Sequence, residues 1–265
     1  MIEEILYNKK PFMVTRPGWV EMESINKGNP TNLLLTNAGF YYDNISVFDE
    51  WSRQYIESMV NSDSVLIIKD WFGNGHWEKH LKPIFNKFKI PTNKGFIGEY
   101  PKDINFYLKF IETTSKDSKI LIISPFTDTI EKNLENIHNI HPNHSIKKEN
   151  IITLKTPQTI RGNVPPHNNW LETHTDLTEH IKGLDFDVAL LSCGCYGQPL
   201  CNYIYKDLGK SAFYIGARLQ LCFGIKGRRW ASECGVTNLY NEHWVRPSSD
   251  EQPNNYNNVE NSAYW

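Results

Sequence analysis

No stretch of this sequence approaches the run of about 20 apolar residues that spans a bilayer. A secretory signal is lacking as well, because the opening residues MIEEILYNKK do not place basic residues ahead of an apolar segment. We therefore expect a cytoplasmic protein without a membrane span.

An excess of charge of either sign is also missing, since 28 Lys and Arg face 30 Asp and Glu. Such a chain has no general attraction for phosphate backbones, so nucleic acid is not expected as a partner. Cysteine is scarce: the five residues all lie between positions 193 and 234 and form no Cys-x-x-Cys pair. The spacing favours reduced thiols over disulfides or a zinc site.

What the chain has is length and aromatic side chains. Its 265 residues include 13 Phe, 13 Tyr and 8 Trp, enough for a globular core. No internal repeat or Pro/Gly/Ser-rich linker divides it, so we expect a single domain over residues 1–265. Periodicity stops near residue 233, which predicts an extended tail over 233–265. Trp244 and Trp265 would expose large apolar surfaces unless this tail packs on the body.

Short β-branched runs alternate with amphipathic stretches, a pattern that predicts an α/β, Rossmann-like fold with a mainly parallel sheet flanked by helices. The predicted strands are 11–15, 64–69, 119–124, 151–155, 186–192 and 211–216. The predicted helices are 47–61, 106–113, 127–137, 170–181 and 199–208. Thr127 and Asp128 are expected to cap the third helix. Residues 139–150, with His141 and His144, are expected to form a solvated surface loop.

Three segments follow predicted strands and could carry chemistry. In the first, RPGWVE, the turn at Pro17 and Gly18 would place Arg16 and Glu21 together at the carboxyl edge of the sheet, where α/β proteins bind ligands. The alternative is a structural Arg/Glu pair in which Glu21 complements the dipole of a helix.

The second segment, SCGCYGQPL, reads as a glycine turn from a strand into a helix. Gly194 and Gly197 would let the backbone approach a phosphate, whose charge the free N–H groups at the helix start would stabilise. The G-x-x-G spacing departs from the dinucleotide fingerprint G-x-G-x-x-G. A tight turn without any ligand is the alternative.

The third segment, GARLQLCFGIKGRRW, gathers Lys226, Arg228 and Arg229 around glycines, with Gln220 at the end of the preceding strand. These donors could converge on an anion held by the glycine turn. A solvated basic face is the alternative reading.

Two other groups indicate chemistry only weakly. His76 and His80 have helical spacing but lack the H-E-x-x-H frame of a metal site. Cys195 follows the glycine turn without an identifiable His or Asn partner, which disfavours a catalytic thiol.

These three segments, with a tail that contains NEHWVRP, resemble a family of uncharacterised bacterial and viral proteins that is itself similar to GT-D type glycosyltransferases. GT-D enzymes carry an arginine, a glycine and an Asp-x-Glu pair at the end of the first strand, and the pair serves the metal and the nucleotide-sugar. Arg16, Gly18 and Glu21 match this pattern, whereas Trp19 stands at the Asp position. The resemblance also implies substrate-binding roles for Gly194, Tyr196, Gly197, Gly216, Gln220, Lys226 and Arg229.

We therefore expect a glycosyltransferase that moves a sugar from a nucleotide-sugar to a glycan or other hydroxyl acceptor, in polysaccharide or glycoconjugate synthesis. Glu21 would be the general base or a ligand of Mn²⁺ or Mg²⁺, with Arg16 orienting it. Two alternatives stay open. One is an NADP-dependent oxidoreductase in which Arg218 reads the 2′-phosphate, and the other is a non-catalytic protein that binds nucleotides or glycans.

Overall fold

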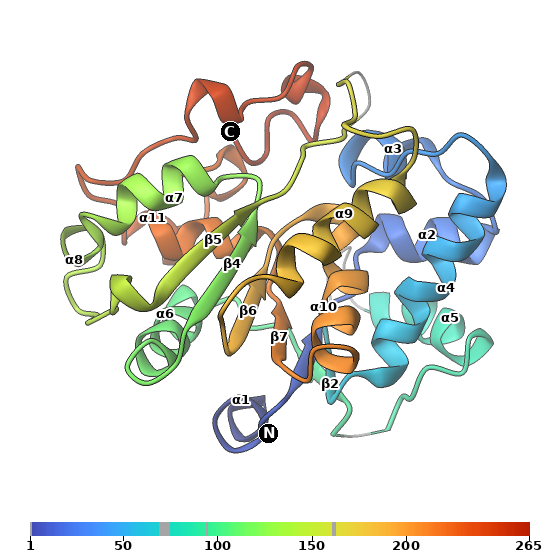
Figure 1. Ribbon diagram of the computed structural model, residues 1–265, viewed down its shortest axis with the longest axis horizontal. Coiled ribbons are helices and arrows are strands. Elements are labelled where there is room, and N and C mark those ends of the chain that lie inside the picture. The colour runs from blue at the N-terminus through green and yellow to red at the C-terminus, as the bar shows by residue number, and fades with distance from the viewer. Residues whose placement is uncertain (1, 69–74, 94, 161–162) are drawn as a thin grey trace.

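The fold is built on one parallel sheet. The computed structural model describes residues 2–68, 75–93, 95–160 and 163–265. Seven strands run parallel in the order β3-β2-β1-β7-β6-β4-β5 (Figure 1). The strands are β1 (Met13–Thr15), β2 (Ser64–Ile67), β3 (Ile97–Glu99), β4 (Ile120–Ser124), β5 (Ile151–Lys155), β6 (Val188–Leu191) and β7 (Ser211–Tyr214).

Helices cover both faces of this sheet. The α-helices are α1 (Ile2–Asn8), α2 (Trp19–Lys27), α3 (Asn32–Asn37), α4 (Ile45–Asn61), α5 (Lys82–Lys87), α6 (Ile104–Thr114), α7 (Thr127–Leu134), α8 (Ile137–Ile140), α9 (Trp170–Lys182), α10 (Gly197–Lys206) and α11 (Cys234–Thr237). Shorter turns are the π-helix η1 (Trp77–Leu81) and the 3-10 helices η2 (Lys148–Asn150), η3 (Gly194–Tyr196), η4 (Gly216–Phe223), η5 (Arg228–Trp230), η6 (Ser249–Glu251) and η7 (Tyr256–Asn258). None of the helices in the described residues is both long and apolar enough to cross a membrane.

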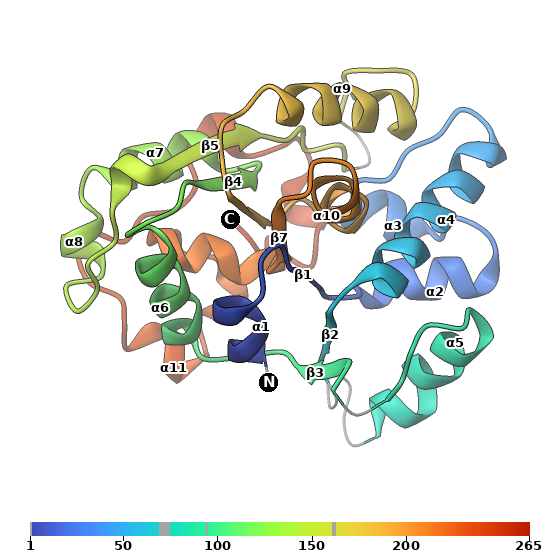
Figure 2. The same cartoon turned by 60° about the horizontal axis from the view of Figure 1, so that its bottom comes forward.

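The strands send alternate side chains into two separate cores. Val14, Ile122 and Phe213 belong to the core shared with α1, α6, α7 and η4. Met13 and Leu121 belong to the opposite core, shared with α2, α4, α9 and α10. Figure 2 shows α1 and α6 on one side of the strands and α4 and α10 on the other. Because both faces are covered, the strands are apolar without alternation, as expected for an inner parallel sheet.

The predicted α/β fold is confirmed, and each of the six predicted strands coincides with an observed one. The predicted end of the second strand, Lys69, lies outside the described residues. The edge strand β3 was not predicted. Its sequence Ile97-Gly-Glu has three residues, of which Ile97 alone is β-branched. A Cβ on Gly98 would lie 2.7 Å from a methyl carbon of Leu66, so a larger residue there would push this side chain aside.

Two local expectations near α7 are wrong. The helix stops at Leu134, and its N-cap is Phe126, without a side-chain cap from Thr127 or Asp128. The predicted loop begins inside α8, and His141 is buried at 4% exposure against the Trp244 ring, 5.3 Å between centroids. Burial lowers the pKa of His141 to about 4, so this imidazole is neutral.

The segment after residue 233 is compact rather than extended. It forms α11 and the turns η6 and η7, and Val245 makes a parallel bridge with Ile225. Trp244 and Trp265 are buried, with 3% and 7% exposure. The carboxylate of Glu251 accepts hydrogen bonds from the backbone N–H groups of Asp128 and Thr129, at 2.8 and 3.2 Å. The C-terminal segment therefore supplies the cap that α7 lacks.

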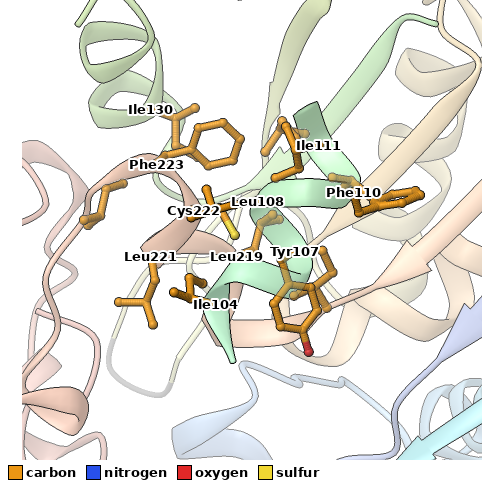
Figure 3. Close-up of a cluster of buried hydrophobic side chains, with 14 of the residues drawn as sticks. Ile104, Tyr107, Leu108, Phe110, Ile111, Ile130, Leu219, Leu221, Cys222 and Phe223 are labelled. Atoms are coloured by element: carbon orange, nitrogen blue, oxygen red, sulfur yellow. The ribbon is translucent and has the colours of Figure 1, made fainter. Parts of the chain in front are cut away.

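Helix α6 fixes the position of η4, the turn that follows β7. Figure 3 shows Leu219, Cys222 and Phe223 of η4 packed with Leu108 and Ile111 of α6 in one buried cluster. Such packing anchors one side of η4 in the core, so its polar residues are held at the edge of the sheet.

Candidate active site

A cavity of about 670 Å³ lies at the carboxyl ends of the strands. Strands β1 and β7 are neighbours in the sheet, but the chain leaves β1 for α2 on one face and leaves β7 for η4 on the other. Such a point, where adjacent connections part to opposite faces, opens a crevice in a parallel sheet. The lining includes Arg16 after β1, Gly194 after β6 and Gly216 after β7. The sheet edge predicted from the sequence is therefore the edge that is hollowed.

Arg16 stands at the centre of this edge. Its carbonyl oxygen accepts a hydrogen bond of 3.1 Å from Gln198 Nε2, which fixes the backbone after β1. Its guanidinium carbon lies 5.1 Å from the ring centroid of Tyr100, a cation–π contact. A Cβ on Gly216 would lie 3.3 Å from Arg16 Nη1, so the bare glycine gives the guanidinium room.

Glu21 lies in the first turn of α2, with its carboxylate folded back over Gly18. A Cβ on Gly18 would lie 1.9 Å from Glu21 Oε2, so any larger residue there would displace this carboxylate. The side chain lines the cavity although Glu21 is only 8% exposed. Burial raises the pKa of Glu21 above its ordinary value, while the positive charge of Arg16 lowers it in part. A buried carboxyl poised in this way is suited to proton transfer.

The glycine turn after β6 is shaped by close packing. A Cβ on Gly194 would lie 2.5 Å from the carbonyl oxygen of Ala38, and one on Gly197 would lie 2.2 Å from the Tyr214 ring. The N–H groups of Cys195 and Gly197 donate to the carbonyl oxygens of Ala38 and Gly194. These two amides are therefore engaged within the protein rather than free. Gly194 lines the cavity, and Gly197 is not among the lining residues.

Three arginines and three glutamates line the cavity within the described part of the chain. Arg218 Nη2 donates to Glu233 Oε1 at 2.7 Å, and Arg229 Nη2 forms an ion pair with Glu260. Arg218 Nη1 is buried and has no hydrogen-bond partner in the described residues. The cavity thus holds guanidinium groups whose charge is balanced by carboxylates.

The remaining predicted binding residues divide between the cavity and its surroundings. Tyr196 and Gln220 line the cavity, and Gln220 Nε2 donates to the Tyr264 carbonyl oxygen at 3.1 Å. Lys226 does not line it, because its ammonium nitrogen lies over the Tyr240 ring, 5.4 Å from the centroid. Arg228 also faces elsewhere and donates to the Asn261 carbonyl oxygen at 2.7 Å.

A metal site built from protein ligands alone does not form in the parts of the chain that the structure describes, where no three His, Cys, Asp or Glu residues are grouped to hold an ion. Glu233 and Glu260 are already bound to arginines. Glu21 is the remaining carboxylate in the lining, and a single carboxylate does not satisfy Mg²⁺ or Mn²⁺ without further oxygen ligands.

His76 and His80 contact an aromatic residue of the cavity lining, and Cys195 is buried. The two imidazoles pack against Trp19, with ring centroids 5.0 and 5.6 Å from its indole. Cys195 is buried, and burial raises the pKa of its thiol well above the ordinary value, which keeps it protonated.

Sequence reasoning missed Tyr100, Glu260 and Tyr264 as lining residues. Tyr100 follows the strand that was not predicted. Glu260 and Tyr264 lie in a segment without periodicity, and their place in the cavity depends on how the C-terminal segment folds back. For these residues the sequence carries no local signal.

Comparison with known proteins places the chain in a family. A sequence profile described as a GT-D fold-like domain matches residues 1–222. The chain belongs to this family.

Solved structures give further similarities. One, titled as a new glycosyltransferase (DUF1792) from Streptococcus sanguinis, is 18% identical with a TM-score of 0.46, over 82% of this chain and 78% of that one. A selenomethionine structure of domain of unknown function 1792 is 11% identical with a TM-score of 0.51, over 92% and 91% of the two chains. The second shows similarity of fold. No curated protein matches the sequence.

Proposed function

We propose that this member of the GT-D-like family is a glycosyltransferase, which moves a sugar from a nucleotide-sugar to a hydroxyl of a glycan acceptor in polysaccharide or glycoconjugate synthesis. The observation that carries the proposal is the placement of Glu21. Its carboxylate is buried, lines the cavity at the carboxyl edge of the sheet and shares that cavity with three arginines. A base beside guanidinium groups matches a reaction that deprotonates a hydroxyl and releases a nucleoside diphosphate.

In the proposed reaction, the Glu21 carboxylate takes the proton of the acceptor hydroxyl. The acceptor oxygen then forms a bond to the anomeric carbon of the donor sugar. The bond from that carbon to the diphosphate oxygen breaks, and its electron pair leaves with the nucleoside diphosphate. Arg16 stabilises the ionised form of Glu21, because its positive charge opposes the effect of burial on the pKa.

The departing diphosphate requires cations, and Arg229 and Arg218 are the guanidinium groups proposed to hold it. Arg218 Nη1 has an unmet hydrogen bond in the described residues, which supports a role as donor to a ligand. Gly18, Gly194 and Gly216 line the cavity, where a bare backbone allows close approach. Tyr196 and Gln220 are proposed to contact the donor. Lys226 and Arg228 are not proposed to bind the donor, because their charged groups contact Tyr240 and the Asn261 carbonyl oxygen instead.

Mn²⁺ or Mg²⁺ could be held only jointly, with Glu21 supplying one ligand and the donor phosphates the others. We favour Glu21 as the base. Transfer should then persist in EDTA and fall as the pH drops through the pKa of Glu21. Loss of transfer in EDTA with recovery in Mn²⁺ or Mg²⁺ would identify Glu21 as a metal ligand instead.

Two other proposals follow from the alternatives above, and one assay separates them. Thermal shift against UDP, GDP, CMP and NADP identifies the ligand class, since a ligand that binds only the native state raises the melting temperature. Stabilisation by NADP alone would favour an oxidoreductase. Stabilisation by a nucleotide without turnover of its sugar conjugate would favour a non-catalytic binding protein.

A further inference from the structure

The last residues of the chain lie in the cavity itself. Glu260, Tyr264 and Trp265 all belong to its lining. They come from the end of the sequence, whereas Arg16 and Glu21 come from its beginning. We call residues 260–265 the C-terminal strap.

The strap holds the groups proposed to bind the donor. The carboxylate of Glu260 pairs with Arg229, and the Tyr264 hydroxyl accepts from Arg229 Nη1 at 3.2 Å. The Tyr264 carbonyl oxygen accepts from Gln220 at 3.1 Å. A carboxylate on a guanidinium has the charge and the planar oxygen pair that a phosphate presents to the same group. Glu260 is therefore placed as an internal substitute for an anionic ligand.

The strap is anchored beyond this ion pair. The Trp265 indole N–H donates to the Glu251 carbonyl oxygen at 3.1 Å, and its ring packs against Phe126 at 6.2 Å between centroids. Arg246 donates to the Trp265 carbonyl oxygen. The C-terminal end of the strap is thus held, and Arg228 donates to the carbonyl oxygen of Asn261, next to Glu260. These contacts keep Glu260 near Arg229 when the ion pair opens.

The backbone of the strap has an unfavourable conformation at Glu260 and the two residues after it. Glu260, Asn261 and Ser262 have φ values of 46°, 56° and 64°, a left-handed conformation that residues with a Cβ rarely adopt in succession. Such a conformation persists where surrounding contacts hold it, and it is frequent at sites that switch. Release of Glu260 from Arg229 would remove one of those contacts.

We propose that the C-terminal strap is autoinhibitory: Glu260 occupies Arg229 in the free protein, and the diphosphate of the donor displaces it. The inference rests on the proposed function, since it assigns the diphosphate to Arg229. Glu260 competes with the ligand for the Arg229 guanidinium, so binding of the donor requires the ion pair between Glu260 and Arg229 to open. The side chains of both partners are about one-third exposed, at 32% and 35%, so an incoming anion has access to the pair.

The test is the affinity of the full-length protein for inorganic pyrophosphate, measured by titration calorimetry. Glu260→Gln keeps the size of the side chain and removes its charge, so it should bind pyrophosphate about three- to tenfold more tightly than the wild type, as expected for loss of a partly exposed ion pair and of repulsion between anions. Glu242→Gln is the matched control, because Glu242 lies in the same segment with its side chain 82% exposed. It should leave the affinity unchanged.

A double-mutant cycle assigns the effect to Arg229. On an Arg229→Ala background, Glu260→Gln should no longer tighten pyrophosphate binding. Hydrogen exchange of residues 256–265 should rise in the wild type when pyrophosphate is added. A thermal melt of Glu260→Gln checks that the variant is folded.

Any of three results would overturn the proposal that the strap is autoinhibitory. The first is that Glu260→Gln binds pyrophosphate no more tightly than the wild type, and the second is that Glu260→Gln gives the same gain in affinity on the Arg229→Ala background. The third is that neither the wild type nor the variant binds pyrophosphate. These readouts do not depend on turnover. If the protein shows these effects on pyrophosphate binding but transfers no sugar, the proposed function is wrong and the autoinhibitory role of the strap still stands.

Discussion

Among single side chains, Glu21 has the environment with the clearest consequences. Its carboxylate is buried, and burial raises its pKa above the ordinary value of 4.5. A carboxyl whose pKa is higher in the folded than in the unfolded protein binds protons more tightly when folded. Stability therefore falls as the pH rises from the unfolded pKa through the folded one, and it stays reduced above that window.

The first prediction follows from this sign. Glu21→Gln cannot ionise, so it should melt at a higher temperature than the wild type at pH 7, and the difference should shrink as the pH falls towards 4. Transfer should drop by about a hundred- to ten-thousandfold, the usual contribution of a general base. Thermal melts across pH 4–8 measure the stability effect. A Gln variant that melts lower than the wild type at pH 7 would show that ionised Glu21 stabilises the fold.

The second prediction separates two basic residues that lie three positions apart. Arg229→Ala should weaken nucleoside diphosphate binding by about 1.5–3 kcal/mol, the value of a hydrogen bond to a charged group. Lys226→Ala is the control and should bind as the wild type does, because its ammonium lies over Tyr240. Calorimetry with the nucleotide that gives the largest thermal shift is the measurement. Equal losses of nucleotide affinity in both variants would show that Lys226 also binds the nucleotide.

The sequence predicted that Arg16 and Glu21 lie together at the sheet edge, because a buried strand leads into a turn at Pro17-Gly18 and then into a helix. Both residues line the cavity. For the glycine turn, a glycine that admits a phosphate and a glycine that admits a neighbouring carbonyl look alike in sequence. Gly194 packs against the Ala38 carbonyl oxygen and also lines the cavity.

Among the helices and strands, the start of α7 shows how a distant residue can replace a local signal. Thr127 and Asp128 have the side chains of a cap, yet the structure uses Glu251, which is 1% exposed. Its carboxylate accepts hydrogen bonds from two backbone N–H groups of α7 and one of 3.1 Å from Ser248. No local pattern near residue 127 could have predicted a cap more than a hundred positions away.

The third prediction tests this cap. Glu251→Ala should lower the free energy of unfolding by about 2 kcal/mol, because it leaves helix N–H groups without a partner and removes a buried charged hydrogen-bond acceptor. Asp250→Ala, in the exposed neighbouring position, should change it by less than about 0.5 kcal/mol. Urea unfolding of both variants is the measurement. Equal stabilities would show that the cap contributes nothing.

Strand prediction succeeded where burial on both faces leaves a continuous apolar run, as in Ile120–Ser124. It failed at Ile97–Glu99, a three-residue edge strand that packs through a glycine. The failure matters for the site, because Tyr100 follows that strand and supports Arg16.

Across the whole molecule, the two ends of the sequence meet at one cavity. Arg16 directly follows the first strand, and the final residues supply Glu260 and Tyr264. The parallel sheet and the crevice at its edge follow from the pattern of strands and helices. The C-terminal segment closes that crevice through tertiary packing, and no periodic pattern in the sequence predicts this packing.

The fourth prediction concerns this closing segment. Deletion of residues 241–265 removes buried Trp244 and Trp265 as well as the Glu251 cap. Each buried Trp is worth about 3–5 kcal/mol, so the melting temperature should fall by at least about 10 °C, or cooperative unfolding should be lost. Calorimetric melts of the deletion and of Trp265→Ala alone are the measurement. A deletion variant that melts with the wild type would show that the segment is dispensable for stability.

The central claim is that this protein transfers sugars and that Glu21 takes the proton. The most direct measurement is the release of nucleoside diphosphate from a panel of UDP- and GDP-sugars with glycan acceptors, by the wild type and by Glu21→Gln in parallel. The account predicts release by the wild type with at least one donor, and loss of release by Glu21→Gln while calorimetry shows that the same nucleotide still binds. Full turnover by Glu21→Gln, or donor binding by the wild type without turnover of any donor in the panel, would contradict it.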